Sequence, residues 1–130
     1  MIPKFRVWDT VKKSMREVQA IVYTVERVYP VYSEVFRRYV PFSEAILMQS
    51  TGLFDVNGKE IFEGDVVLEN GWRKVAVSFG TQEIEENFGD KRIFQGFNLY
   101  LGGGYPEAVM SKYEIIGNIY ENPELVEEGK

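Results

Sequence analysis

The sequence contains neither cysteine nor histidine. Without cysteine the chain can form no disulfide bond, which is compatible with a reducing compartment but does not require one. The usual zinc sites are excluded because they need thiolate or imidazole ligands, and nucleophiles of the cysteine and serine–histidine types are excluded with them. No side chain with an unperturbed pKa changes its charge near neutral pH. We therefore expect no enzymatic activity.

Long apolar runs are also missing. No segment approaches the roughly 20 apolar residues of a membrane-spanning helix. The start of the chain has no continuous apolar core of about 7–15 residues, so we expect no signal peptide, no membrane partner and a cytoplasmic location. Positive charge is scarce beyond residue 40. Residues 1–40 carry eight basic and four acidic side chains, whereas residues 41–130 carry seven basic and 16 acidic ones. Only the N-terminal third therefore offers a face for nucleic acid.

What the 130 residues do contain is typical of a β-rich globular protein. The apolar share is 45% and the aromatic share 15%, which suits side chains that pack on pleated sheets. Residues 5–8 alternate apolar and polar side chains, and a polar turn separates them from a β-branched run that ends near residue 25. This pattern predicts an opening antiparallel hairpin. Asn57-Gly58 and Asn70-Gly71 predict two more hairpin turns, because this pair takes the positive φ values that a two-residue turn requires.

Residues 30–41 allow two interpretations. Apolar side chains recur there with helical spacing, at Tyr32, Val35, Phe36 and Tyr39. Pro30 suits the start of a helix, so we expect one short helix. The alternative is an extended segment, because nine residues form a marginal helix and the segment is rich in valine and tyrosine. The fold class is accordingly mainly β, with α+β as the alternative.

Residues 45–121 contain about five short strands joined by tight turns, a pattern typical of a small barrel. The segment Glu60–Val67 resembles the turn-into-strand segment of SH3-like barrels, and the resemblance implies a sharp bend at Gly64-Asp65. We therefore predict a β-rich N-terminal extension with a hairpin over residues 1–44, an SH3-like barrel over residues 45–122, and an acidic tail over residues 123–130. Residues 81–91 are expected to form an acidic loop.

Four blocks carry a family resemblance: Lys4–Asp9, Leu47–Leu53, Asp55–Val66 and Ile115–Leu125. Together, and in this order, they resemble the YopX family of small proteins encoded by phages and prophages of bacteria. The resemblance implies an SH3-like barrel preceded by a β-rich extension. It also implies a bacterial cytoplasmic setting during infection or lysogeny, and it implies no catalytic activity.

Candidate contact residues for a macromolecule lie mainly in the basic N-terminal third. They are Lys12, Lys13, Arg37 and Arg38, and Arg16 could extend the patch that they form. Arginine binds phosphate and the neighbouring aromatic rings could stack on bases. The other interpretation is that the aromatic side chains form a buried helix face and the two adjacent arginines face solvent. Trp8 and Trp72 are core residues or interface anchors, and Trp72 joins the candidate set.

Three further patterns are weak. Asp55-Val56-Asn57-Gly58 begins like a calcium loop but lacks the later oxygen ligands, so a hairpin turn is favoured. Gly102-Gly103-Gly104 is followed by Tyr105-Pro106 and not by the Lys-Ser/Thr pair of a phosphate loop. An acidic cluster could bind Mg²⁺, although a solvated loop explains it as well; its members are Glu83, Glu85, Glu86 and Asp90.

These observations favour a non-catalytic phage accessory protein that binds another macromolecule, a protein in the first place, and that self-associates. Aromatic richness without catalytic machinery is the reason. The alternative is a nucleic-acid-binding protein that uses the basic N-terminal third. A third hypothesis is a metal-dependent phage enzyme that uses the acidic cluster around Glu85. We assign no catalytic residue, no cofactor and no small-molecule substrate.

Overall fold

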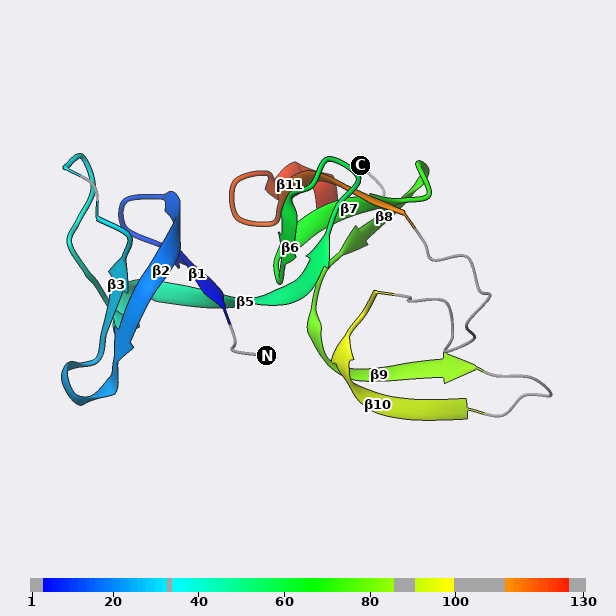
Figure 1. The fold of residues 1–130 in the computed structure, drawn as a ribbon, viewed down its shortest axis with the longest axis horizontal. Helices are drawn as coiled ribbons and strands as arrows, with labels where there is room; N and C mark the ends of the chain where they lie inside the picture. The colour runs from blue at the N-terminus through cyan, green and yellow to red at the C-terminus, as the bar shows by residue number, and fades with distance from the viewer. Residues whose placement is uncertain (1–3, 33, 86–90, 100–111, 127–130) are drawn as a thin grey trace. The chain divides into compact units, whose positions relative to one another are not determined.

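The computed structural model describes residues 4–32, 34–85, 91–99 and 112–126, without the side chains of residues 81–85 and 91–94. The chain divides into two compact units, Met1–Ser50 and Thr51–Lys130 (Figure 1). Strands dominate both units, and the helical content of the described residues consists of short 3-10 turns. The mainly β class is therefore confirmed. Within the described ranges, no helix has the length and apolar character needed to span a membrane.

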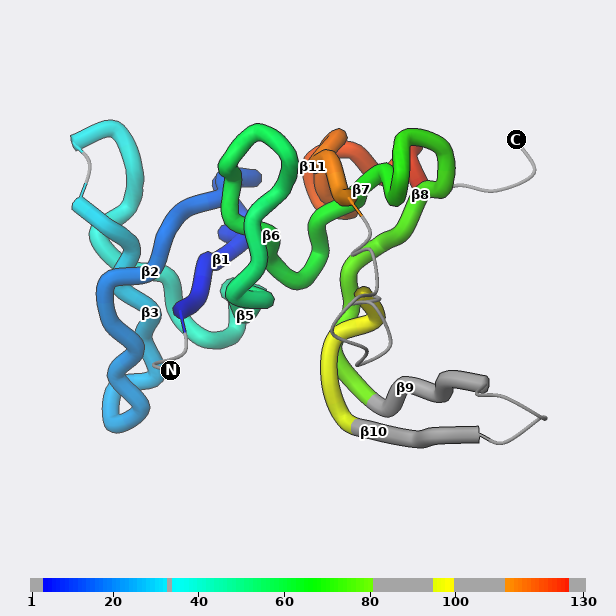
Figure 2. The backbone as a smooth tube through the Cα atoms, turned by 45° about the vertical axis from the view of Figure 1, so that its right-hand side comes forward, coloured from blue at the N-terminus to red at the C-terminus, as the bar shows by residue number. Residues whose placement is uncertain are grey.

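The first unit is an antiparallel sheet. Its strands are β1 (Phe5–Asp9), β2 (Ser14–Val22), β3 (Arg27–Pro30), β4 (Val40–Pro41) and the first half of β5 (Ala45–Phe54). They lie in the order β4-β3-β2-β1-β5, and the pairing of β2 with β3 can be followed in Figure 2. A turn links β2 to β3 through a 3-10 segment, η1 (Tyr23–Val25). Val7, Val28, Val40 and Met48 are almost completely buried and form the core positions of this sheet.

The short helix predicted within residues 30–41 is wrong. The described residues between β3 and β4 form turns and bends, and a single 3-10 turn, η2 (Phe42–Glu44), follows β4. The helical spacing is misleading because Pro30 and Pro41 are both strand residues, paired with Val18 and Arg27. The aromatic face expected to be buried is largely exposed, and Tyr32 keeps 67% of its surface accessible.

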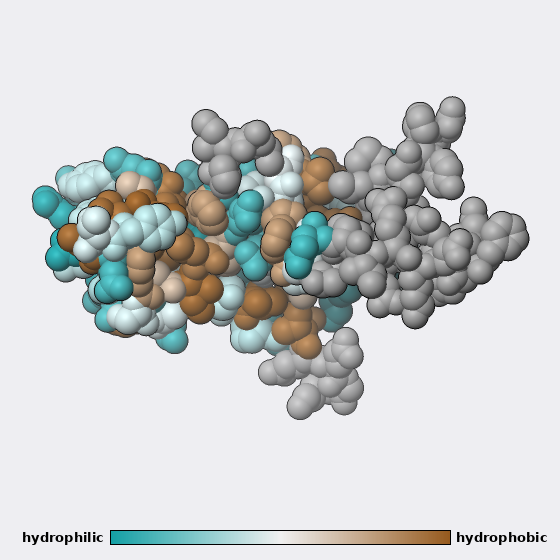
Figure 3. All heavy atoms as spheres, turned by 90° about the horizontal axis from the view of Figure 1, so that it is seen from below, coloured by the Kyte–Doolittle hydropathy of each residue, from teal (hydrophilic) through white to brown (hydrophobic). Residues whose placement is uncertain are grey.

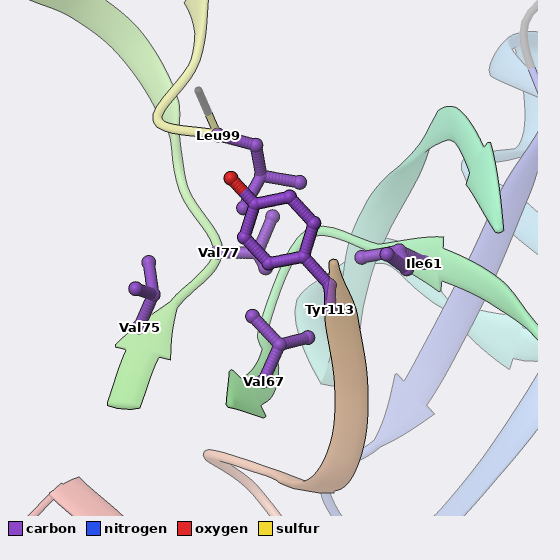
Figure 4. Packing of buried hydrophobic residues seen from close by; sticks show 6 residues of the cluster. All are labelled: Ile61, Val67, Val75, Val77, Leu99 and Tyr113. Carbon is purple, nitrogen blue, oxygen red and sulfur yellow. The ribbon is translucent and has the colours of Figure 1, made fainter. Parts of the chain in front are cut away.

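The described residues of the second unit form six strands besides the end of β5. They are β6 (Glu60–Phe62), β7 (Asp65–Glu69), β8 (Arg73–Ala76), β9 (Phe79–Glu85), β10 (Lys91–Phe97) and β11 (Tyr113–Asn118). β6 lies beside β5, β11-β7-β8 form a three-stranded sheet, and β9 and β10 form a hairpin. Figure 4 shows the core of this unit, where the Tyr113 ring lies among aliphatic side chains that include Val67 and Val77. The described strands do not close into a barrel, so the SH3-like barrel stays a prediction.

The two Asn-Gly pairs form different turns. Asn70 (φ 53°) and Gly71 (φ 85°) are both left-handed, as predicted, and the Trp72 amide donates to the Glu69 carbonyl at 3.2 Å. The two-residue turn predicted at Asn57-Gly58 is wrong, because only Gly58 (φ 81°) is left-handed. There the Asp55 carboxylate accepts the amides of residues 57 and 59, at 2.9 and 2.8 Å, and this organises a longer turn.

The acidic loop predicted over residues 81–91 is also wrong in part. Residues 81–85 belong to β9, where Glu85 pairs with Lys91 and Glu83 with Ile93 of β10. The polar composition predicted a loop here because Ile84 is the only apolar residue among residues 81–85 of β9. Glu86 and Asp90 lie outside the described residues.

Turn residues shape the second unit at two places. Gly64 (φ 90°) donates its amide to the Val77 carbonyl at 2.8 Å, and the Asp65 carboxylate accepts the Phe62 amide at 2.8 Å. After β11, the Asn118 side chain accepts the amides of residues 120 and 121, at 3.0 and 2.8 Å. A 3-10 turn, η5 (Pro123–Val126), then folds back so closely that a Cβ on Gly117 would lie 2.7 Å from Leu125 Cδ1. These residues therefore determine backbone shape.

Candidate macromolecule-binding site

The turn between β1 and β2 is organised by Asp9, whose side chain is buried. Asp9 Oδ1 accepts the amides of Val11 and Lys12, both at 3.0 Å, and the Asp9 carbonyl accepts the Lys13 amide at 2.8 Å. Lys13 takes a left-handed conformation, with φ 55°. The turn therefore presents Lys12 and Lys13, two of the predicted contact residues, to solvent.

Arg37 ties the segment after β3 to this turn. Its Nε donates to Asp9 Oδ2 at 2.9 Å, and its Nη2 donates to Asp9 Oδ1 at 2.7 Å. Its Nη1 lies 2.8 Å from Glu44 Oε1, so one guanidinium holds two carboxylates. The Arg37 side chain keeps 26% of its surface exposed, against 4% for Asp9. Arg37, which one interpretation of the sequence placed in solvent, therefore binds two carboxylates of the first unit.

The charged groups in this cluster shift each other's pKa values. Burial raises the pKa of Asp9, but the hydrogen bonds from Arg37 and from two backbone amides outweigh burial and leave that pKa below its usual value. The pKa of Arg37 is raised, with the hydrogen bond to Asp9 as the largest cause. Both groups are therefore more firmly charged than they would be in water, which strengthens the tie.

Arg16 of β2 makes a second tie. Its Nη1 donates to the Arg37 carbonyl at 3.0 Å, and its Nη2 donates to the Val31 carbonyl. The same guanidinium lies over the Phe36 ring, 4.9 Å from the ring centroid, which is within cation–π range. The described backbone of residues 31, 32 and 34–39, hereafter the pinned loop, is therefore held near both of its ends by arginine side chains.

Apolar side chains of the pinned loop nevertheless remain in solvent. They form, with Val11 of the β1–β2 turn, the loop patch: Val11, Val31, Tyr32, Val35 and Phe36. Val35 is 85% exposed, and the least exposed member of the patch, Phe36, keeps 46% of its surface accessible. Figure 3 shows apolar side chains at the surface of the first unit. Isolated exposed apolar residues are ordinary, but these five lie within two neighbouring segments.

Cations border the loop patch. Lys12, Lys13 and Arg38 are exposed, and the Asp9–Arg37 pair brings their two segments together. The pinned loop also carries the exposed Glu34. The structure therefore joins four of the predicted contact residues in one region, three as exposed charges and Arg37 as a tie.

Trp72, the fifth, lies in the second unit at the tip of the β7–β8 hairpin. Its side chain is 76% exposed, whereas Trp8 of β1 is buried. The tip is braced, because the Asn70 amide donates to the Lys112 carbonyl at 2.7 Å and the Lys112 amide donates to Asn70 Oδ1 at 3.0 Å. Trp72 is thus an exposed aromatic side chain on a well-supported turn.

The remaining candidate sites find no support as binding sites. The Asp55 carboxylate accepts three backbone amides, including that of Ile115 at 3.0 Å, so it serves the turn. The side chains of Glu83 and Glu85 are outside the described part of the chain, as are residues 86–90 and 102–104. In the ranges that are described, no three acidic side chains gather as a metal site would require.

The sequence reasoning missed Asp9 and Glu44, the carboxylates that hold Arg37. A signal for Asp9 was present, because an aspartate that ends a strand before a polar turn commonly accepts amides of that turn. Nothing in the sequence indicated its pairing with a residue 28 positions away.

Comparisons with known proteins give the chain a family. The sequence model of the YopX protein family matches residues 4–127. The crystal structure of protein EF1440 from Enterococcus faecalis is similar, with a TM-score of 0.54 and 28% sequence identity. That similarity covers 98% of this chain and 99% of the other. No curated protein matches the chain.

Proposed function

Since the chain belongs to the YopX family, we propose that it is a phage or prophage accessory protein that acts without catalysis, in the bacterial cytoplasm, by binding another protein. The loop patch is the surface that binds. One observation carries this proposal: the pinned loop is tied near both ends by Arg16 and Arg37, yet its apolar side chains face solvent.

The physical reason lies in the cost of binding. A flexible loop must lose conformational entropy when a partner orders it, about 0.5–1.5 kcal/mol for each immobilised side chain with many rotamers. The ties to Asp9 and Glu44 order the backbone in advance. Exposed apolar surface costs solubility, and the aromatic and arginine side chains present here are those enriched at protein interfaces.

A patch variant with a matched control tests this. The patch variant, Tyr32→Ser with Val35→Ser, removes apolar surface from the pinned loop. The control, Tyr23→Ser, removes a similarly exposed tyrosine in η1, which precedes β3, whereas the pinned loop follows β3. Each tagged protein is used for capture from phage-infected cells, and any captured protein is purified and titrated. We expect wild type and the control to bind it equally and the patch variant to bind at least about tenfold more weakly. Equal binding by all three proteins would refute the role of the patch.

Nucleic acid is the second candidate, because Lys12, Lys13 and Arg38 border exposed aromatic side chains. Basic side chains beside aromatic rings are the elements of single-strand binding. Arg16 and Arg37, however, already bind carbonyl and carboxylate groups of the protein, which weakens this candidate. Titration of single- and double-stranded DNA and RNA across salt concentrations tests it. Affinity that falls with salt and is lost in Lys12→Glu/Lys13→Glu would support nucleic acid; no affinity at low salt would exclude it.

For the second unit we propose a supporting role built on an SH3-like barrel. The left-handed Gly64 before β7 and the packed turn after Gly117 support this, because they curve the chain as a small barrel requires. A metal-dependent activity around Glu85 is the competing idea. If Mg²⁺, Mn²⁺ or Ca²⁺ raises the melting temperature of the full chain, the non-catalytic proposal loses ground; we expect no change.

A further inference from the structure

One face of the second unit combines acidic and apolar side chains. Glu114, Leu68 and Lys74 lie opposite one another across β11, β7 and β8, on the side of the sheet away from the buried Val67 and Val75. The turn η5 lies against this side, because Lys74 Nζ donates to the Leu125 carbonyl at 2.9 Å. Three exposed acidic residues lie in β11, in η5 and in the turn between them: Glu114, Glu124 and Glu121.

Two exposed apolar side chains accompany these acids. Trp72 leads directly into β8, where Lys74 lies two residues further on, and Val126 ends η5 with 42% of its surface accessible. We call these five residues the acidic face: Trp72, Glu114, Glu121, Glu124 and Val126. Three glutamates outnumber Lys74 on this face, whereas three cations, Lys12, Lys13 and Arg38, outnumber the exposed Glu34 at the loop patch.

The two units also differ in overall charge. Residues 1–50 carry eight basic and five acidic side chains, whereas residues 51–130 carry seven basic and 15 acidic ones. The first unit of one copy is therefore attracted electrostatically to the second unit of another copy. Two first units, or two second units, repel each other. The exposed apolar side chains of each surface then provide area that can be buried on contact.

We propose that the loop patch of one copy docks on the acidic face of a second copy. This rests on the proposed function, in which the loop patch binds another protein. It identifies that protein as a second copy of the same chain. A single such contact joins two different surfaces and is heterologous. When each copy both gives and receives it, the pair is a closed two-fold dimer, which is an isologous arrangement. Trp72 and Val126 meet the apolar side chains of the pinned loop, while Lys12, Lys13 and Arg38 meet the glutamates.

Charge exchange tests the contact directly. One variant carries Lys12→Glu and Lys13→Glu, and the other carries Glu114→Lys and Glu124→Lys; all four side chains are exposed. Sedimentation velocity is measured at salt concentrations of about 50 and 500 mM, which bracket a Debye length of about 8 Å. We expect wild type to associate at low salt and to dissociate at high salt. Each variant alone should associate at least tenfold more weakly, and their mixture should regain association.

A matched control and the contrary outcomes complete the test. Lys59→Glu changes charge in the same sense at an exposed lysine of the second unit, and it should not weaken association. A wild-type protein that stays monomeric at low salt, or association that neither variant changes, or a mixture that remains monomeric, would overturn the contact. If wild type is monomeric but the Tyr32→Ser/Val35→Ser variant still loses a captured partner, the proposed function stands and only the identity of the partner is wrong.

Discussion

Replacing Asp9 with asparagine should loosen the pinned loop and destabilise the first unit. The change keeps the size of the side chain but places an amide where a carboxylate now accepts four donors. Removing one partner of a fully buried ion pair costs about 3–5 kcal/mol. Arg37 keeps 26% of its surface exposed, so water recovers part of this loss. We expect a destabilisation of about 2 kcal/mol.

Urea unfolding measures this difference. With a slope of about 2 kcal/mol per molar urea, the midpoint of Asp9→Asn should fall by about 1 M relative to wild type. Glu17→Gln is the control, because it removes an exposed carboxylate of β2 and should leave the midpoint unchanged. A midpoint for Asp9→Asn equal to that of the control would show that the Asp9–Arg37 pair does not hold the loop.

The same pair predicts a dependence on pH. The pKa of Asp9 is lower in the folded protein than in the unfolded chain, so its contribution is complete above the ordinary aspartate pKa of about 4. It is lost as the pH falls from there through the lowered pKa of the folded state. Wild type and Asp9→Asn should therefore converge in stability in acid. A difference that stays constant down to pH values of about 2.5 would contradict this linkage.

Three other predictions concern shape. Gly117→Ala should lower stability by about 1–3 kcal/mol, because its Cβ would lie 2.5 Å from Asn122 Oδ1, whereas Gly80→Ala meets nothing within 4 Å and should be close to neutral; thermal melts of the two variants compare them. Asp55→Asn should cost about 1–2 kcal/mol in urea unfolding, because the Ile115 amide loses its acceptor at Oδ2, and a neutral result would mean that the Asp55 carboxylate does not hold β11. In Trp8→Phe the remaining tryptophan is the exposed Trp72, so acrylamide should quench its fluorescence readily. In Trp72→Phe the remaining tryptophan is the buried Trp8, so acrylamide should barely quench its fluorescence. Equal quenching of the two variants would contradict the placement of both residues.

Local patterns in the sequence predicted the first strand and one turn well. The alternation of residues 5–8 and the Asn70-Gly71 pair depend on neighbouring residues alone, and both appear as predicted. The helix within residues 30–41 failed because its outcome depends on distant partners. Arg16 and Asp9 bind this segment from β2 and from the end of β1, and periodicity contains no information about such contacts.

In the candidate site, too, local features were predictable from the sequence and features that depend on distant partners were not. The sequence located the basic and aromatic residues correctly along the chain, but it could not separate those that hold the loop from those that face solvent. Arg37 and Arg38 are adjacent and chemically identical, yet Arg37 binds two carboxylates and Arg38 is exposed. Only the fold makes this distinction, because it depends on where Asp9 and Glu44 come to lie.

The central claim is that the pinned loop is ordered before any partner arrives. Backbone amide order parameters from NMR relaxation test it most directly, at residues 34–39 of wild type and of Asp9→Asn. We predict order parameters of about 0.85 in wild type, as in rigid backbone, and below about 0.6 in the variant. Values below about 0.6 in the wild-type protein itself would contradict the claim, because the loop would then be mobile despite its arginine ties.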